Sequence, residues 1–446
     1  MPTTLSMLLF WGDENLATAI HKRMFSTQSE ATSNVNRNLP RWWRTSKAIE
    51  FVRRHFGARL RCWLTVQTYH ATVRRYETKM VASAPKNAPG DFKGHRFSDQ
   101  SNPRLFFLGT DEQQDRSGLL QALERAADVR VFMREDGSYG QNDPRPPVVR
   151  IPDITRRLWS VLEQLAFEHW TPQILISQTW ASVIDPEVFS RIRERWGTLI
   201  VNISMDDRHQ FVGPRLAKGR YGGVRPLIPH LDLALTAAPE CVKWYVHEGC
   251  PAVFFPEASD PDIFYPMPDL PKIHDVSFVG ARYGIREKVI TALRRAGIRV
   301  RAHGAGWEGG RLTVDEVSRL FAQSRIVLGI GTIGYCDDFY ALKLRDFDAP
   351  MSGSCYLTHD NPDLHLLYDV GREIVTYKTV DECIAKAKHL LTYKNEREAI
   401  ARAGRARAER QHTWDNRFAE FFRILQAVVN SDTSAYKLHT EFSSRL

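Results

Sequence analysis

The segment LGIGTIGYCDDFYALKLRDFDAPMSGSCYLT, residues 328–358, carries the pattern that decides the fold. An apolar run, RIVLGI (325–330), overlaps its start and predicts a buried strand, and a second strand-like run, CYLT (355–358), ends it. Between them we predict a helix from about residue 338 to 348, which Pro350 ends. A strand, a helix and a second strand in this order are typical of a parallel sheet.

The same alternation extends in both directions along the chain. A first series of strand-like runs, separated by helix-like segments, lies at 104–109, 129–133, 173–177, 198–204, 231–236 and 252–255. A second series lies at 275–280, 298–303, 325–330, 355–358 and 373–377. Five prolines within 256–274 separate the two series and indicate a stiff connector.

Two such series predict an α/β protein with two doubly wound Rossmann-like domains that face each other across a cleft. In this architecture ligands bind at the carboxyl ends of the strands. The expected divisions are a basic N-terminal extension, partly disordered or helical (1–103), an N-terminal Rossmann-like domain (104–255), a proline-rich linker (256–274), a C-terminal Rossmann-like domain (275–410), and a C-terminal helix and tail (411–446).

The positive charge of the chain lies at its N-terminal end. The formal net charge is +9, and residues 1–104 hold 17 Lys and Arg against 7 Asp and Glu. Within this extension, residues 41–66 place apolar side chains at helical spacing with arginines between them. This pattern is compatible with contact to an anionic membrane surface, with packing on the body of the protein, or, as the least favoured interpretation, with nucleic-acid binding.

No apolar run is long enough to span a bilayer, so we expect a cytoplasmic protein whose only membrane contact is peripheral, at the inner membrane surface. The six cysteines include no C-x-x-C pair. We expect them to be buried reduced thiols rather than disulfides or zinc ligands. We expect no metal site and no cofactor.

A glycine pattern in the opening segment is a weak match to a nicotinamide site. Gly329-x-Gly331-x-x-Gly334 follows a strand-like run, but the predicted helix begins too late for the tight turn of that motif. A second match that starts at Gly304 is no better, because its helix is predicted to begin near Thr313. There the sequence TVDE forms a capping box.

Several longer segments resemble one enzyme family over roughly residues 104–425. They are LDLALTAAPECVKWYVHEGCPAVFFPEASDPDIFYP (231–266), DVSFVGARYGIREKVITALRRAGI (275–298), LKLRDFDAPMSGSCYLTHDNPDL (342–364), GREIVTY (371–377) and EREAIARAGRARAERQHTW (396–414). The chain resembles the retaining glycosyltransferases of the GT-B fold (glycosyl transferases group 1), and within them the spore-maturation and spore-coat branch.

The resemblance implies residues for the donor site. In the wider family two glutamates separated by seven residues line the donor pocket, and a glycine follows the second. Asp348 with Gly353 fits the second position, which implies contact with the donor's ribose. The first position falls on Tyr340, which is not acidic, so the contact to the donor's sugar is undefined. The family also implies a grip on the diphosphate by Gly280, Arg282 and Arg286, and by charge and position we add Lys343, Arg345 and Gly304 to these donor-binding candidates.

Residues for the acceptor are less defined. The segment NISMDDRHQF (202–211) ends a predicted strand, so Asp206, Asp207 or His209 could face the cleft, and we take Asp207 as the candidate base. An Asp in this place is also a common helix cap or turn former. The loop at 109–118 is a further candidate for the cleft wall. Asp207, Arg282 and Lys343 are the predicted catalytic residues.

The predicted function is transfer of a sugar from a nucleoside-diphosphate-sugar donor to an unknown acceptor, with retention and without a metal. Two alternatives stay open. One is an inactive GT-B-like binding or structural protein of a cell- or spore-surface pathway. The other is a sugar-nucleotide epimerase, which would convert the donor without any acceptor.

Overall fold

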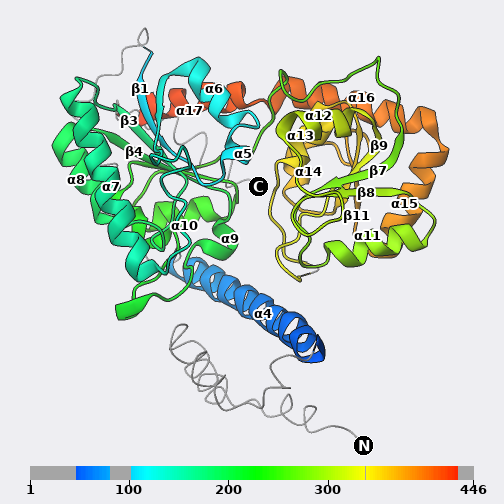
Figure 1. Cartoon of the computed structure of the whole chain (residues 1–446), viewed down its shortest axis with the longest axis horizontal. Coiled ribbons are helices and arrows are strands. Elements are labelled where there is room, and N and C mark those ends of the chain that lie inside the picture. Colours follow the sequence, from blue (N-terminus) through cyan, green and yellow to red (C-terminus); the bar gives the residue numbers. More distant parts are fainter. Residues whose placement is uncertain (1–46, 81–101, 337, 430–446) are drawn as a thin grey trace, which may run out of the picture. The chain divides into compact units, whose positions relative to one another are not determined.

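The computed structural model describes residues 47–80, 102–336 and 338–429 (Figure 1). The chain divides into two compact units, residues 1–61 and 62–446. The second unit contains two parallel β-sheets, each covered by helices, as the alternating sequence pattern predicts.

The first sheet has six parallel strands in the order β2-β1-β3-β4-β5-β6. Its central strands are buried on both faces, which is why they read as continuous apolar runs rather than as alternating ones. The strands are β1 (Arg104–Leu108), β2 (Asp128–Val131), β3 (Ile174–Ser177), β4 (Leu199–Ser204), β5 (Leu233–Thr236) and β6 (Ala252–Phe254).

Local signals set the ends of the helices around this sheet. Asp111 caps α5 (Glu112–Asp115) by accepting hydrogen bonds from the backbone N–H groups of Gln113 and Gln114. Gly197, at φ 68°, ends α8 (Glu187–Trp196) in the left-handed conformation that glycine adopts readily. The other helical elements are α6 (Leu119–Ala126), α7 (Pro147–Phe167), α9 (Asp207–Gln210), α10 (Cys241–His247) and the 3₁₀ turns η1 (Ala217–Gly219) and η2 (Arg225–His230).

The second sheet has five parallel strands in the order β11-β10-β9-β7-β8. They are β7 (His274–Val279), β8 (Val300–His303), β9 (Ser324–Leu328), β10 (Cys355–His359) and β11 (Val375–Tyr377). The connecting helices are α11 (Arg286–Arg295), α12 (Val314–Ala322), α13 (Arg345–Met351), α14 (Leu364–Leu367), α15 (Val380–Thr392) and α16 (Lys394–Gln411). The predicted capping box is present at α12, between Thr313 and Glu316.

The helix predicted at 338–348 is wrong in both of its ends. α13 begins at Arg345, because the Asp346 carboxylate accepts a hydrogen bond from the backbone N–H of Lys343 and so fixes the turn that starts the helix. Pro350 lies inside α13 instead of ending it. A proline there cannot donate to the carbonyl of Asp346, and the Tyr368 hydroxyl donates to that carbonyl instead, at 2.8 Å.

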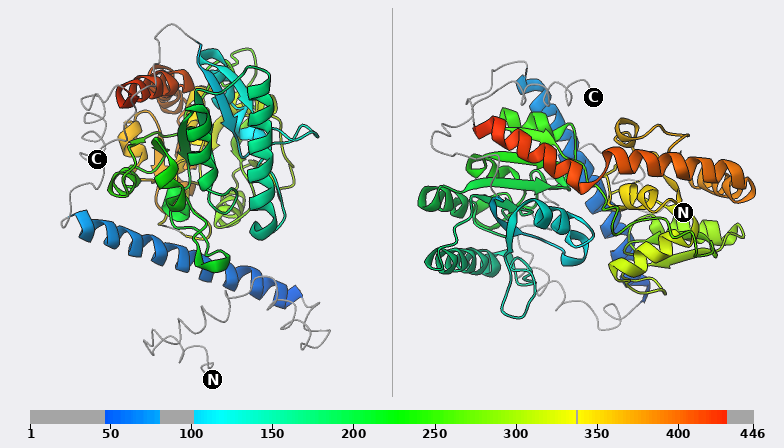
Figure 2. Two further views of the ribbon diagram at one scale, coloured as in Figure 1. Left: turned by 90° about the vertical axis from the view of Figure 1, so that its left-hand side faces the viewer. Right: turned by 90° about the horizontal axis from the view of Figure 1, so that it is seen from above.

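The last helix, α17 (Trp414–Val429), packs on the first sheet although it follows the second in sequence. Its apolar face, which includes Trp414 and Phe421, shares a core with Leu105 and Phe107 of β1. Figure 2 shows this helix in red beside the elements of the first sheet. Residues 414–429 of the segment that we predicted as a separate C-terminal helix and tail therefore complete the core of the N-terminal domain.

Residues 62–80 of the predicted extension also pack on the first domain, as part of α4 (Lys47–Met80). The Tyr69 hydroxyl donates to Glu240 at 3.0 Å, and the Tyr76 ring stacks on Trp244 with centroids 5.7 Å apart. Most side chains of the segment 41–66, for which membrane contact was one interpretation, lie outside the described residues. Among the described helices, none has the length and apolar character needed to cross a membrane.

The prediction that all cysteines are reduced is wrong for one pair. Cys62 of α4 and Cys336 form a disulfide, with Cα atoms 6.3 Å apart. The two residues are 274 positions apart in sequence, so no spacing rule could have paired them. Cys241, Cys250, Cys355 and Cys383 are free and buried, as expected.

We expect Trp414→Ala to lower the free energy of unfolding by about 3–5 kcal/mol, because it removes a large side chain that is 1% exposed from a shared core. Chemical denaturation followed by circular dichroism measures this change. The control is Arg423→Ala on the same helix, which removes a half-exposed pair with Glu420 and should cost about 0.5 kcal/mol or less. Equal effects of the two substitutions would contradict a structural role for α17.

Candidate functional site

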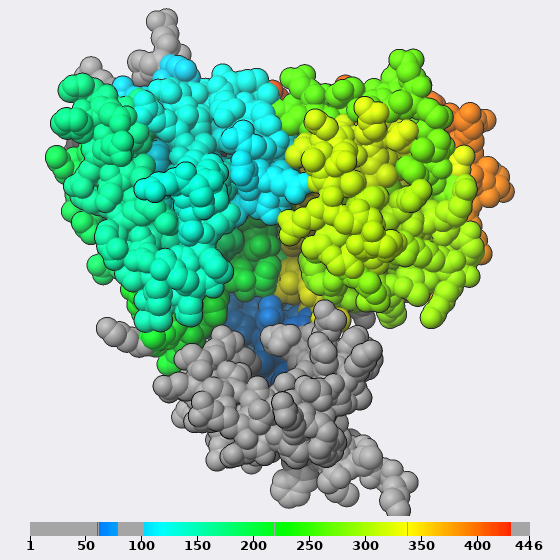
Figure 3. All heavy atoms as spheres, viewed as in Figure 1, coloured from blue at the N-terminus to red at the C-terminus, as the bar shows by residue number. Residues whose placement is uncertain are grey.

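A cavity of about 510 Å³ lies where the carboxyl ends of strands from both sheets meet. Its wall includes residues that follow β1, β4 and β6 of the first sheet and β7 and β8 of the second, among them Thr110, Asp206, Glu257, Gly280 and Gly304. In Figure 3 the loop after β1, in cyan, meets atoms of the second domain, and the Gln113 side chain donates a hydrogen bond to the carbonyl of Leu312 there.

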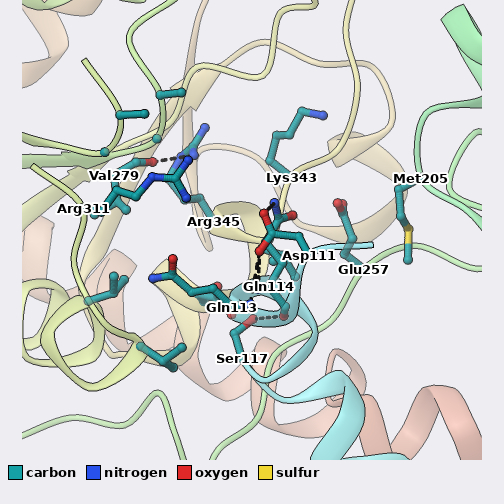
Figure 4. A pocket seen from close by; sticks show the side chains of 18 of the residues that line it. Asp111, Gln113, Gln114, Ser117, Met205, Glu257, Val279, Arg311, Lys343 and Arg345 are labelled. Atoms are coloured by element: carbon teal, nitrogen blue, oxygen red, sulfur yellow. Dashed lines mark hydrogen bonds between the residues drawn. The ribbon is translucent and has the colours of Figure 1, made fainter. Parts of the chain in front are cut away.

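The guanidinium groups of two arginines lie next to the same aromatic ring in this wall. Arg286, the first residue of α11, donates from Nη1 to the carbonyl of Ala281 at 2.9 Å. Arg345, the first residue of α13, donates from Nη1 to the carbonyl of Val279 at 2.5 Å (Figure 4). Both lie over the ring of Phe278, at 5.6 and 4.9 Å from its centroid.

The positive charge of this pair is not neutralised by the protein. Among the described residues, no carboxylate forms an ion pair with Arg286 or Arg345, and the Nε atom of each is buried without a hydrogen-bond partner. Burial, and then the neighbouring charge of Arg345, lower the pKa of Arg286 to about 10, so Arg286 stays cationic at neutral pH. Two unpaired cations with donor atoms to spare form a site for an anion with several oxygens.

Gly280 allows the two arginines to come this close to the backbone. Its φ is 154°, and a Cβ atom at this position would lie 2.9 Å from Nη1 of Arg345 and 3.2 Å from Nη1 of Arg286. Gly304 lies directly behind it, since a Cβ there would be 2.5 Å from the carbonyl oxygen of Gly280. A side chain at either position would displace the cationic pair or the strand end that carries it.

A lysine and two acidic residues form a second charged group in the cavity. Lys343 Nζ lies 3.7 Å from the Asp206 carboxylate. Although burial opposes the charge of Lys343, the carboxylates of Asp206 and Glu257 raise its pKa. Burial raises the pKa of Glu257 to about 8, and the charge of Lys343 opposes this shift. In Figure 4 Lys343 and Glu257 lie on one side of the view, and Arg345 lies on the other.

Asp348 lies in the cavity wall, on α13. It is 5% exposed, and its Oδ1 has no hydrogen-bond partner among the described residues. Burial raises the pKa of its carboxyl well above the ordinary range. Gly353, predicted with it, is not part of the wall; at φ 70° it turns the chain against Pro266.

The structure places Asp207 away from the cavity. Its carboxylate is 1% exposed and accepts hydrogen bonds from the hydroxyls of Ser204, at 2.5 Å, and Tyr245, at 3.0 Å. Burial raises its pKa to about 7. Asp207 therefore holds the turn between β4 and α9 against Tyr245 of α10, and its neighbour Asp206 is the residue that reaches the cavity.

Two other predicted residues also lie outside the wall. The guanidinium of Arg282 pairs with Glu287 and lies over the ring of Trp307, with 42% of the side chain exposed. The carbonyl of Tyr340 accepts a hydrogen bond from Arg208, and its ring meets His359 edge to face at 5.4 Å. Their placement gives no support to a direct role of Arg282 or Tyr340 in donor binding.

Glu257, Gln178 and Trp180 line the cavity and were not predicted. Each follows the end of a strand of the first sheet, β6 or β3, which is the signal that could have identified them. The loop 109–118, named as a candidate, does contribute Thr110, Asp111, Gln113, Gln114 and Ser117 to the wall.

Comparisons with known proteins agree with the fold. A family model described as glycosyl transferase-like matches residues 286–423. Sucrose-phosphate synthase from Thermosynechococcus elongatus is 12% identical, with a TM-score of 0.52 over 74% of this chain and 100% of that chain. HepE of Anabaena in complex with UDP-glucose is 10% identical, with a TM-score of 0.53 over 73% of this chain and 100% of that chain.

At these identities the structural likeness shows a shared fold, the GT-B arrangement of two Rossmann-like domains. A search of curated protein sequences found no match. The finer resemblance to the spore-maturation and spore-coat branch stays a prediction.

The two adjacent aspartates should respond to substitution to different degrees. Asp207→Ala leaves two buried hydroxyls without an acceptor, so we expect it to lower the free energy of unfolding by about 1–3 kcal/mol. Asp206→Ala should cost about 1 kcal/mol or less, because its side chain is partly exposed at the cavity. Thermal and chemical unfolding measure both, and an unstable Asp206→Ala beside an unchanged Asp207→Ala would contradict the assignment.

Proposed function

We propose that this chain, which has the GT-B fold, is a glycosyltransferase that transfers a sugar from a nucleoside-diphosphate-sugar donor to a hydroxylated acceptor. The observation that carries the proposal is the pair of uncompensated guanidinium groups of Arg286 and Arg345 in the cavity between the domains. A diphosphate supplies the negative charge and the acceptor oxygens that this pair lacks.

Neighbouring residues offer contacts to the other parts of the proposed donor. The free carboxyl oxygen of Asp348 can bind the ribose hydroxyls, because a carboxyl group accepts from two adjacent hydroxyls. HepE of Anabaena was solved with UDP and with UDP-glucose, which supports a uridine nucleotide as the donor's carrier here. Arg345 then reaches the diphosphate from the start of the same helix that carries Asp348.

The chemical step is rupture of the bond between the anomeric carbon and the diphosphate oxygen. Negative charge builds on the departing diphosphate, and a fixed positive environment lowers the barrier for its departure. Arg286 and Arg345 supply this environment from the protein itself, so we propose transfer without a metal ion. Retention of the anomeric configuration follows the family resemblance and is part of the proposal.

The acceptor side is formed by the first domain. The wall of the cavity there includes the polar residues Thr110, Gln113, Gln114 and Gln178, and Asp206 adds a carboxylate. Such a wall suits an acceptor that exchanges many hydrogen bonds, as a carbohydrate or another polyol does. Asp206, rather than Asp207, is then the residue placed to orient an acceptor hydroxyl.

We expect Arg345→Ala to weaken UDP binding about tenfold or more, because it removes a charged donor at the diphosphate. Isothermal titration calorimetry with UDP measures this, and a melting curve checks that the variant is folded. Arg299→Ala is the control, since this arginine is 78% exposed and precedes β8 at the opposite end of the sheet. Unchanged UDP affinity in a folded Arg345→Ala protein would remove the pair from the donor site.

Transfer itself should persist in EDTA. Incubation of the protein with nucleotide-sugars and a panel of glycan acceptors, followed by detection of released nucleoside diphosphate and of product, measures it. We expect product only when donor and acceptor are both present, at a rate that EDTA leaves within about twofold. Loss of activity in EDTA that Mg²⁺ or Mn²⁺ restores would show that the arginine pair is not sufficient.

A further inference from the structure

Glu257, three residues after β6, is a buried acid with one carboxyl oxygen that has no hydrogen-bond partner in the described part of the chain. Its side chain is 7% exposed, and Oε2 is buried with no hydrogen bond to any described residue. It lines the cavity and is seen there in Figure 4, with Lys343 on the same side of the view. An unpaired buried carboxyl group is unfavourable for the fold, so its presence in a ligand cavity points to a ligand that completes its hydrogen bonds.

The nucleotide end of the proposed donor does not need Glu257. The diphosphate has Arg286 and Arg345, and the ribose has Asp348. The sugar ring is the part of the donor that has no assigned partner. The family resemblance implies an acidic residue for this contact at position 340. Tyr340 lies outside the cavity wall, and the neighbouring Asp338 is exposed and also outside it.

We propose that Glu257, together with Lys343, binds the hydroxyl groups of the sugar that is transferred, in place of an acidic residue at position 340. This inference rests on the proposed function and deepens it by naming a sugar-specific contact. Glu257 comes from the connector between the domains, whereas position 340 belongs to the second domain. The acidic contact would therefore be supplied by the connector and not by the second domain.

The chemistry of the pair suits a sugar. A hydroxyl both donates and accepts a hydrogen bond, the Lys343 ammonium only donates, and a carboxyl group accepts or, when protonated, also donates. Burial raises the pKa of Glu257 to about 8, so the protonated form is accessible at neutral pH. Lys343 and Glu257 together can thus satisfy both functions of neighbouring hydroxyl groups.

The test compares binding of UDP with binding of UDP-glucose, UDP-galactose and UDP-N-acetylglucosamine to wild type, Glu257→Gln and Glu257→Leu. Both variants nearly keep the size of the side chain, and Leu removes all hydrogen bonding. We expect the affinity for UDP to stay within about twofold in both. The ratio of the affinity for the preferred UDP-sugar to the affinity for UDP should fall about tenfold in Glu257→Leu and by a smaller factor in Glu257→Gln.

Glu396→Gln is the matched control, because this acid is half-exposed and pairs with His389 on α15. An unchanged preference for the sugar-nucleotide in folded Glu257→Leu or Glu257→Gln would overturn the inference while leaving the proposed function intact. A wild type that binds UDP but gains nothing from any of the three sugars would also overturn it. Failure of the wild type to bind UDP at all would overturn the proposed function itself.

Discussion

The constraint on which the site depends is the placement of two like charges at the end of one strand. Arg286 and Arg345 lie over the same aromatic ring, Phe278, and no described carboxylate neutralises them. Backbone carbonyls hold the two groups, and glycine at 280 leaves them room. Two like charges placed so near each other repel, and a bound anion would relieve the repulsion. The proposed binding of a diphosphate rests on this fixed positive environment.

The fold makes this preparation possible by dividing the site between two sheets. The second sheet brings the cationic pair, and the first brings the polar wall and the acids Asp206 and Glu257. Lys343 lies near both acids, and its positive charge offsets their negative charge. After the second domain the chain returns to the first, where α17 packs on the first sheet. The strand ends of both sheets that carry these groups line one cavity. In the proposed function, this division assigns the donor mainly to one domain and the acceptor to the other.

Much of the fold was predictable from the sequence because strands buried on both faces read as uninterrupted apolar runs. The eleven strands found within the described residues lie close to the runs identified along the chain, and the capping box at Thr313 is present as predicted. The predicted bounds of the helix were wrong at α13, because a tertiary contact outweighs the local sequence rule there. Pro350 is usually a helix terminator, but a tertiary hydrogen bond from Tyr368 replaces the one that the proline cannot donate. No local pattern contains that partner.

The sequence by itself determined the alternation of strands and helices, and with it the strand ends at which charged residues gather. Only the tertiary structure decided which of them face the cavity. Asp206 and Asp207 are adjacent and alike, yet one reaches the cavity and the other is buried by Ser204 and Tyr245. The role that we propose for Glu257 depends on groups that lie far from it in the sequence. The physical reason is that the direction of a side chain after a strand end depends on how the turn packs, and that packing comes from distant parts of the chain.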